Sequence, residues 1–156
     1  MSISDELTVR IGEDTDINVL ARFNVALAWE TEHKELPLPV VTRGVQTLLR
    51  NPQYGFYVVA EHANTVVGSL MVTFEWSDWR CGLFWWIQSV YVYPESRRRG
   101  VFGRLFEFVE ERASCEPDVC GLRVYVEQSN RAAQSTYTKV GMKETPYSKV
   151  YEKMLV

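Results

Sequence analysis

Residues 89–111 read SVYVYPESRRRGVFGRLFEFVEE, and this stretch decides the fold. A run of β-branched and aromatic residues stops at Pro94, and a basic turn with a glycine then leads into a helical pattern. A strand that enters a helix through such a turn points the first backbone N–H groups of the helix at one place. That place favours phosphate, and Arg97, Arg98 and Arg99 stand beside it. The stretch therefore predicts a site for a phosphorylated ligand.

The chain has 156 residues, 46% hydrophobic and 24% charged, which suits one globular domain over residues 1–156. A net charge of −3 does not favour nucleic acid. Cys81, Cys115 and Cys120 are odd in number and lack C-x-x-C spacing, so they predict neither a disulfide framework nor a metal site. The first residues, MSISDELTVR, lack the apolar stretch of a signal peptide, and the apolar run 83–93 is too short to span a membrane. We expect a reduced, cytoplasmic protein with neither a membrane nor a nucleic acid as partner.

The hydrophobic pattern predicts an α/β chain with the order βααβββαβαβ. Strands are expected at residues 8–11, 55–61, 65–76, 83–93, 121–126 and 149–156, and helices at 14–30, 40–50, 100–114 and 130–140, with a loop at 30–39. Short turns favour an antiparallel meander for the three central strands, and the strand–helix–strand unit after it predicts a parallel pair. The expected fold is a mixed sheet of about six strands flanked by about four helices.

Two common nucleotide fingerprints are absent from the basic turn. The dinucleotide motif G-x-G-x-x-G needs more glycines than Gly100 and Gly103, and the phosphate loop G-x-x-x-x-G-K-[ST] is missing. A pyrophosphate cradle made of backbone N–H groups and arginine charge remains. A nucleotide-binding domain stays as an alternative, which predicts binding of ATP or NAD but not of coenzyme A.

Two segments carry a resemblance to a known family. Val90, Val92 and Pro94, followed by Arg97, Gly100 and Phe102, resemble the hydrophobic-x-V-x-P strand and the [RQ]-x-x-G-x-[GA] turn of the GNAT superfamily of N-acetyltransferases. Residues 130–137 (NRAAQSTY) and 139–142 (KVGM) are similar to the family's N-x-x-A-x-x-x-Y and x-x-G-[FM] segments. The element order matches along most of the chain. The resemblance implies a GNAT-like fold and an acyltransferase that uses acetyl-CoA as co-substrate.

Phe102 departs from the pattern, because the family usually has glycine or alanine there to let the backbone approach the pyrophosphate. Phe102 can turn inward as a core residue, and Gly103 can relieve the crowding. The resemblance implies that the pantetheine arm pairs with the backbone at Val90 and Val92. The full set expected at acetyl-CoA is Val90, Val92, Arg97, Arg98, Arg99, Gly100, Val101, Phe102, Gly103, Arg104 and Asn130.

The catalytic groups follow partly from the same resemblance. Tyr137 stands where the family has the general acid that protonates the departing thiolate, although a tyrosine there can equally be a core residue. Strand alternation places Trp86, Gln88, Val90 and Val92 on one face. Trp86 and Gln88 occupy the usual positions of the base, and neither titrates. Glu75, near tryptophans that would tune it for proton transfer, is the candidate base, and a solvated strand-end carboxylate is the alternative.

The acceptor pocket is expected from charge and aromatic content. Glu32 and His33, in the loop after the first helix, are second candidates for the base and for acceptor binding, together with Trp76, Trp86 and Gln88. Glu30, Glu32, Glu35 and Glu75 would form an acidic mouth, and Trp76, Trp79, Trp85 and Trp86 an aromatic wall. That combination suits a small cationic amine or a peptide amine.

The sequence as a whole predicts direct transfer of an acetyl group to a primary amine in a ternary complex, since no cysteine falls on either motif. The rival hypothesis is a non-catalytic CoA-binding or sensing module, motivated by the missing base and by Phe102. The amine acceptor, the acyl chain length and a homodimeric state are left open by the sequence.

Overall fold

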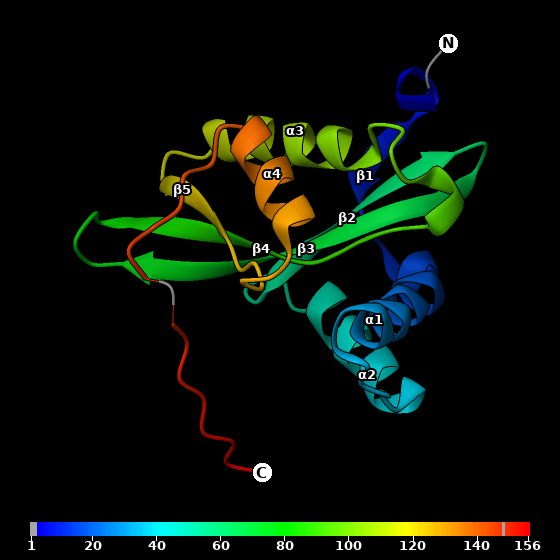
Figure 1. Cartoon of the computed structure of the whole chain (residues 1–156), viewed down its shortest axis with the longest axis horizontal. Coiled ribbons are helices and arrows are strands. Elements are labelled where there is room, and N and C mark those ends of the chain that lie inside the picture. The colour runs from blue at the N-terminus through cyan, green and yellow to red at the C-terminus, as the bar shows by residue number, and fades with distance from the viewer. Residues whose placement is uncertain (1–2, 148) are drawn as a thin grey trace. The chain divides into compact units, whose positions relative to one another are not determined.

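The computed structural model describes residues 3–147 and 149–156 and divides into two compact units, Met1–Tyr125 and Val126–Val156. The first unit contains a five-stranded sheet and three α-helices (Figure 1). Its elements are η1 (Ile3–Glu6), β1 (Thr8–Ile11), η2 (Asp14–Asp16), α1 (Ile17–Glu32), α2 (Leu38–Leu49), β2 (Gly55–His62), β3 (Thr65–Ser77), β4 (Gly82–Val92), η3 (Pro94–Ser96), α3 (Val101–Ser114) and β5 (Val119–Val124). The second unit contains α4 (Arg131–Lys139). In the described part of the chain, no helix combines the length and the apolar content needed to cross a membrane.

The strand order is β1-β2-β3-β4-β5, with antiparallel neighbours up to β4 and a parallel β4–β5 pair. The predicted meander and the predicted parallel unit are therefore confirmed. Helices α1 and α2 cover one face of the sheet, and α3 covers the other (Figure 1). On the α3 face the packing is close at Gly68, where an added Cβ would lie 2.8 Å from Val101 Cγ1.

The core on the α1–α2 face is formed by residues from three elements. Leu20 and Ala21 of α1, Val45 of α2 and Tyr57 and Val59 of β2 make up this cluster. All five are nearly excluded from solvent. Burial of this apolar area, at about 25 cal/mol per Å², is the main force that holds the two helices to the sheet.

The predicted loop at 30–39 is too long. Helix α1 continues to Glu32, and α2 already begins at Leu38. Pro37 caps α2 and Pro39 lies in its first turn, where the missing N–H of proline costs no helical hydrogen bond. The two prolines therefore start a helix here, whereas the sequence analysis took them as loop residues.

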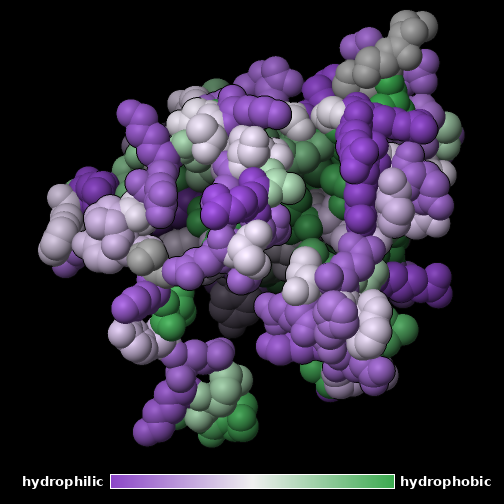
Figure 2. Space-filling view, viewed as in Figure 1, coloured by the Kyte–Doolittle hydropathy of each residue, from purple (hydrophilic) through white to green (hydrophobic). Residues whose placement is uncertain are grey.

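The predicted sixth strand at 149–156 is wrong. No strand is present in the described residues of the second unit, and the sheet has five strands. The alternating pattern of the segment favours a strand only when one face is buried and the backbone finds a partner. Neither condition holds, since Tyr151 is 91% and Leu155 89% exposed. Figure 2 shows the apolar colour at the end of this segment.

An arginine–carboxylate cluster connects β1, η2 and β2. Arg10 donates to both carboxylate oxygens of Asp16 at 2.7 and 2.9 Å and to Glu61 at 2.7 Å. Asp16 is only 3% exposed. Burial alone would raise the pKa of Asp16, but hydrogen bonds from Arg10 and from the Glu13 backbone outweigh it and lower that pKa below its ordinary value. The cluster therefore satisfies a buried charge and fixes the start of α1.

Candidate functional site

Strand β4 carries a β-bulge where it faces β3. Ser69 pairs with Tyr91 and Met71 with Gln88, so the two residues between Gln88 and Tyr91 oppose a single residue of β3. Ser89, in the bulge, has a left-handed backbone with φ 51°. A bulge leaves its extra residue outside the hydrogen-bond ladder and turns the strand locally. Nothing in the sequence indicates it, because serine is not a residue that favours this conformation.

The bulge changes which residues share a face. Gln88 and Tyr91 now lie on the same face, and Val92 pairs with Gly68, whose missing Cβ would point at α3. The sequence-based expectation that Trp86, Gln88, Val90 and Val92 share one face is therefore wrong beyond Gln88. Trp86 and Gln88 do lie on one face, which is the face covered further along by α1 and α2.

The end of β4 has an open edge. β5 pairs with β4 as far as Ile87, opposite Val124, and no further. The stretch Gln88–Val92 therefore has β3 on one side and no strand of the described sheet on the other. An unpaired edge offers N–H and C=O groups to which an extended ligand can pair as an added strand. Val90 and Val92, expected to act through their backbone, both lie in this stretch.

The basic turn after β4 has the shape of an anion site. Arg98 and Gly100 are both left-handed, with φ 62° and 81°, and Gly100 is the N-cap of α3 without a side-chain capping bond. The first N–H groups of α3 therefore receive no cap from that residue. A Cβ at Gly103 would meet nothing within 4 Å, so the surface beside it is open. This geometry favours a phosphate oxygen.

The side chain of Arg97 is engaged by groups of β4 and α1. Its Nε donates to the Val92 carbonyl at 2.8 Å, and its Nη2 donates to Glu30 Oε2 at 2.7 Å. The guanidinium lies 5.4 Å from the ring centroid of Tyr91. Arg98 and Arg99 are exposed. Of these three described arginines, Arg97 forms an ion pair with Glu30 of α1.

Phe102 and Arg104 occupy the first turn of α3. The Phe102 ring is half-buried, 6.0 Å from the ring of the buried Phe106. This placement is consistent with an inward-turned side chain that leaves the backbone of the turn accessible. Arg104 Nε lies 3.5 Å from Glu107, one turn further along the helix.

Glu75 does not lie in the apolar surroundings expected from its neighbours in sequence. Arg123 of β5 donates to its carboxylate and also lies 3.6 Å from the ring centroid of Phe84. The sequence could not predict this contact, because the parallel register that sets Arg123 opposite Trp86 joins segments far apart in the chain.

The predicted aromatic wall does not form. Trp85 and Trp86 are consecutive strand residues and therefore point to opposite faces. Trp85 is 5% exposed in the core. Trp76 and Trp79, near the β3–β4 turn, are 58% and 85% exposed. Only Trp86 joins the face that carries Gln88, where its ring stacks on Tyr125 at 4.2 Å.

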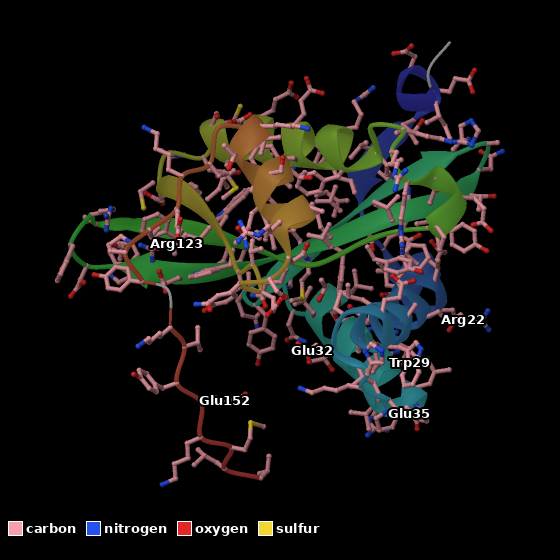
Figure 3. The ribbon with its side chains drawn as sticks, viewed as in Figure 1. Arg22, Trp29, Glu32, Glu35, Arg123 and Glu152 are labelled. Atoms are coloured by element: carbon pink, nitrogen blue, oxygen red, sulfur yellow. The ribbon has the colours of Figure 1, made fainter. Side chains whose placement is uncertain are left out.

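The predicted acidic mouth does not form either. Its four expected members were Glu30, Glu32, Glu35 and Glu75. Three of them have cationic partners: Arg97 for Glu30, Lys34 for Glu32 and Arg123 for Glu75. Figure 3 shows Glu32 and Glu35 at the end of α1 and in the loop after it, apart from Arg123. His33, the C-cap of α1, is exposed with its ring 5.5 Å from Trp29.

A polar and aromatic surface lies on the same face as Trp86. Gln88 Nε2 donates to Thr73 Oγ1 at 2.5 Å, and the Trp86–Tyr125 stack and Arg123 stand beside it. The sequence pattern at 121–126 predicts a plain strand and assigns no role to Arg123 or Tyr125. The available signal was their spacing of two, which sets both side chains on one face.

The second unit holds the other motif. Asn130 caps α4, its Oδ1 accepting from the Ala133 N–H at 3.1 Å, which confirms the predicted cap. Burial raises the pKa of the Tyr137 phenol above its ordinary value of 10.0. Gly141, with φ 90°, ends the helix, and the Met142 N–H donates to the Tyr137 carbonyl at 3.1 Å. The helix end thus fixes the backbone of Tyr137.

The mixed sheet, the bulged strand with an open edge and the uncapped turn before α3 define an α/β fold suited to an extended phosphorylated ligand. The chain belongs to the GNAT acetyltransferase family, since the model of the "Acetyltransferase (GNAT) family" matches residues 22–142. A possible acetyltransferase from Clostridium difficile 630 has 41% sequence identity and a TM-score of 0.88, over 96% of this chain and 98% of that chain.

More distant structures share the fold. An aminoglycoside acetyltransferase from an uncultured soil metagenomic sample, in complex with sisomicin, is 16% identical with a TM-score of 0.79, over 97% of this chain and 99% of that one. A ribosomal-protein-alanine N-acetyltransferase from Brucella melitensis biovar Abortus 2308 is 12% identical with a TM-score of 0.76, over 95% and 99%. A search of the curated proteins finds no significant match.

Proposed function

We propose that the protein is an acetyl-CoA-dependent N-acetyltransferase that transfers the acetyl group directly to a primary amine. The observation that carries this proposal is the open edge of β4 at Gln88–Val92, next to the uncapped N-terminus of α3, in a member of the GNAT family. The edge offers backbone groups for the pantetheine arm, and the turn offers them for the pyrophosphate. These two parts of coenzyme A are the same whichever amine accepts the acetyl group.

In this proposal the turn binds the pyrophosphate through backbone N–H groups of Val101 to Gly103, with charge from Arg98, Arg99 and Arg104. The Arg104 N–H itself donates to the Gly100 carbonyl at 3.2 Å. The pantetheine arm pairs with Gln88–Val92, and Asn130 contributes an amide. A backbone N–H at the bulge, at Val90, polarises the thioester carbonyl and stabilises the oxyanion that forms when the amine attacks.

Two side chains are proposed for the proton transfers. Tyr137 protonates the departing thiolate, and its raised pKa keeps the phenol protonated at neutral pH. Glu75 accepts a proton from the amine, whose pKa in a lysine-type side chain is about 10.4. Arg123 donates to the Glu75 carboxylate, so the incoming amine has to share this carboxylate with Arg123.

The proposed acceptor is a small, cationic amine or a peptide amine. Support comes from the Trp86–Tyr125 stack, in which Tyr125 is 59% exposed and can attract a cation, and from the polar groups of Gln88 and Thr73 beside it. Glu32 and His33, at the end of α1, are assigned to the outer part of the acceptor site. Trp76 was also expected there, but it is three strand residues from Thr73 and lies on the other face of the sheet. Three of the four carboxylates expected at the acceptor site are paired with cations. The aromatic surface is therefore the main support for a cationic acceptor. The three exposed free cysteines, Cys81, Cys115 and Cys120, are consistent with the cytoplasm.

A thermal-shift screen with acetyl-CoA, CoA, ATP and NAD tests the proposal, followed by CoA release with a panel of amines. A ligand that binds only the folded state adds RT ln(1 + [L]/Kd) to the free energy of unfolding, about 2.7 kcal/mol at 100 times Kd. We expect the coenzyme A species alone to raise Tm, and at least one amine to release CoA. Stabilisation by ATP or NAD without CoA would contradict the proposal.

A non-catalytic CoA-binding module is the second candidate. The engagement of Glu75 by Arg123, together with the non-titrating Trp86 and Gln88, favours it. The two candidates separate in the amine panel, because a module binds CoA but releases none from acetyl-CoA with any amine, and Tyr137→Phe then has no effect.

A further inference from the structure

The open-edged stretch of β4 lacks the support that the rest of the strand has. Up to Ile87, β4 is hydrogen-bonded to strands on both sides, whereas Gln88–Val92 has only β3, and the bulge interrupts that pairing as well. A stretch held on one side opens more readily than one held on two. A binding edge that must present its backbone groups in fixed positions therefore needs another attachment.

Arg97 and Glu30 form such an attachment, which we name the Glu30–Arg97 bridge. Glu30 uses one carboxylate oxygen for each of two partners: Oε2 accepts from Arg97 Nη2 at 2.7 Å, and Oε1 accepts from the Tyr91 hydroxyl at 3.4 Å. Arg97 Nε donates to the carbonyl of Val92, the last residue of β4, at 2.8 Å. Every contact of the bridge therefore ends on the last two residues of β4 or on α1.

The side chains around the Glu30–Arg97 bridge belong to α1 and to the end of β4. Tyr91 is 6% exposed and packs against Phe23 of α1, with ring centroids 4.8 Å apart. The Arg97 guanidinium lies over the Tyr91 ring, 5.4 Å from its centroid. The N–H groups at the start of α3 lie on the next element of the chain, and Arg98, with a left-handed backbone, separates Arg97 from them.

We propose that Arg97 is a positioning residue: through Glu30 it fastens the open-edged stretch Gln88–Val92 to α1, and its side chain does not bind the phosphates. This inference rests on the proposed function, in which that stretch is the edge that receives the pantetheine arm. It also couples the acceptor side of the molecule to the cofactor edge, because Glu30 belongs to the last turns of α1, next to Glu32 and His33.

Amide hydrogen exchange in the CoA-free protein tests the bridge without any need for activity. The variants are Glu30→Gln, Arg97→Gln and the two combined. Arg50→Gln is the matched control, since it breaks an exposed arginine–carboxylate pair with Asp14 elsewhere. An exposed pair contributes up to about 1 kcal/mol, so exchange at Gln88–Val92 should become about fivefold faster in each single variant.

The double variant should exchange about as fast as Arg97→Gln alone, because Arg97→Gln already removes the ion pair that Glu30→Gln breaks, and the glutamine side chain in Glu30→Gln can still accept from the Tyr91 hydroxyl. Exchange at Gly82–Ile87 in the same protein should stay at the wild-type rate, as should both stretches in Arg50→Gln. Wild-type exchange at Gln88–Val92 in Glu30→Gln would overturn the proposal.

A binding experiment separates a positioning role of Arg97 from a phosphate contact. CoA and pantetheine share the pantetheine chain, but only CoA has the pyrophosphate. Arg97→Gln and Glu30→Gln should weaken both ligands by the same factor, whereas a loss of CoA affinity alone in Arg97→Gln would overturn the proposal. If the wild-type protein binds neither ligand, the proposed function is contradicted. Amide hydrogen exchange then still decides whether the Glu30–Arg97 bridge stabilises Gln88–Val92.

Discussion

The two halves of β4 are held in different ways. Gly82–Ile87 has a hydrogen-bonded strand on each side, and Gln88–Val92 has one side only. Each half also has one glutamate–arginine pair: Glu75–Arg123 connects β3 to β5 across the first half, and Glu30–Arg97 connects α1 to the end of the second. The Glu75–Arg123 pair is added to a stretch that is hydrogen-bonded to both β3 and β5. The Glu30–Arg97 pair stands where the pairing with β5 is missing. Similar chemistry thus reinforces one half and replaces strand pairing in the other.

The largest expected effect is on stability, in the first half of the strand. Ile87→Ala removes a side chain that is 1% exposed and leaves a cavity, which should lower the free energy of unfolding by about 3 kcal/mol. Urea unfolding followed by tryptophan fluorescence measures it. CoA affinity of the folded protein should stay unchanged, and a parallel loss of affinity would show that the two halves do not act separately.

Next in size is the loss of the proposed acid. Tyr137→Phe should lower turnover about 100-fold while acetyl-CoA affinity stays the same. The sign of the pH effect follows from the raised pKa: the phenol carries its proton below that pKa and loses it as pH rises past it, above 10.0. Initial rates against pH check this, and a basic limb well below pH 10 would have to come from another group.

Glu75→Gln tests whether Glu75, which pairs with Arg123 beside the first half of β4, acts as the base in the reaction. As a half-exposed ion pair it should contribute at most about 1 kcal/mol to stability. As the base, Glu75 should account for about 100-fold in turnover at neutral pH. Rates from pH 5 to 9, set beside Tm, separate the two roles. Unchanged turnover with a small change in Tm would leave Glu75 with a structural role only.

The basic turn should give a smaller effect, on affinity. Arg98→Gln combined with Arg99→Gln removes two exposed cations from the proposed phosphate site and should weaken CoA about tenfold. The effect should shrink at 1 M salt, where the Debye length is about 3 Å. Titration calorimetry with CoA and with pantetheine measures it, and equal losses for the two ligands would place these arginines away from the pyrophosphate.

The smallest expected effect concerns the bulge that divides the two halves. Ser89→Gly places glycine at φ 51°, where a side chain is strained, and should raise stability by about 0.5 kcal/mol, since the greater flexibility of unfolded glycine offsets part of the gain. Thermal unfolding measures it. A loss of stability would indicate that the serine side chain contributes a contact that outweighs the strain.

The sequence predicted the local elements better than the site. Helices and inner strands follow from the hydrophobic period, and the basic turn from the residues 94–104 themselves. The bulge at Ser89 was not predictable, and it changes which face the following residues take. The partner of Glu75 was not predictable either, because Arg123 reaches it only through the β4–β5 register. The alternating pattern at 149–156 predicted a strand that does not form, because alternation does not report whether a partner strand exists.

The three exposed cysteines have a consequence for measurement. Acetyl transfer releases a thiol, and the usual way to follow it is a disulfide reagent that reacts with any accessible sulfur. Cys81, Cys115 and Cys120 are all free and exposed, so the protein itself consumes up to three equivalents of reagent per chain before any turnover. An initial burst of that size, independent of the amine, belongs to the protein. Substituting serine at these three positions would leave a signal that comes from coenzyme A alone.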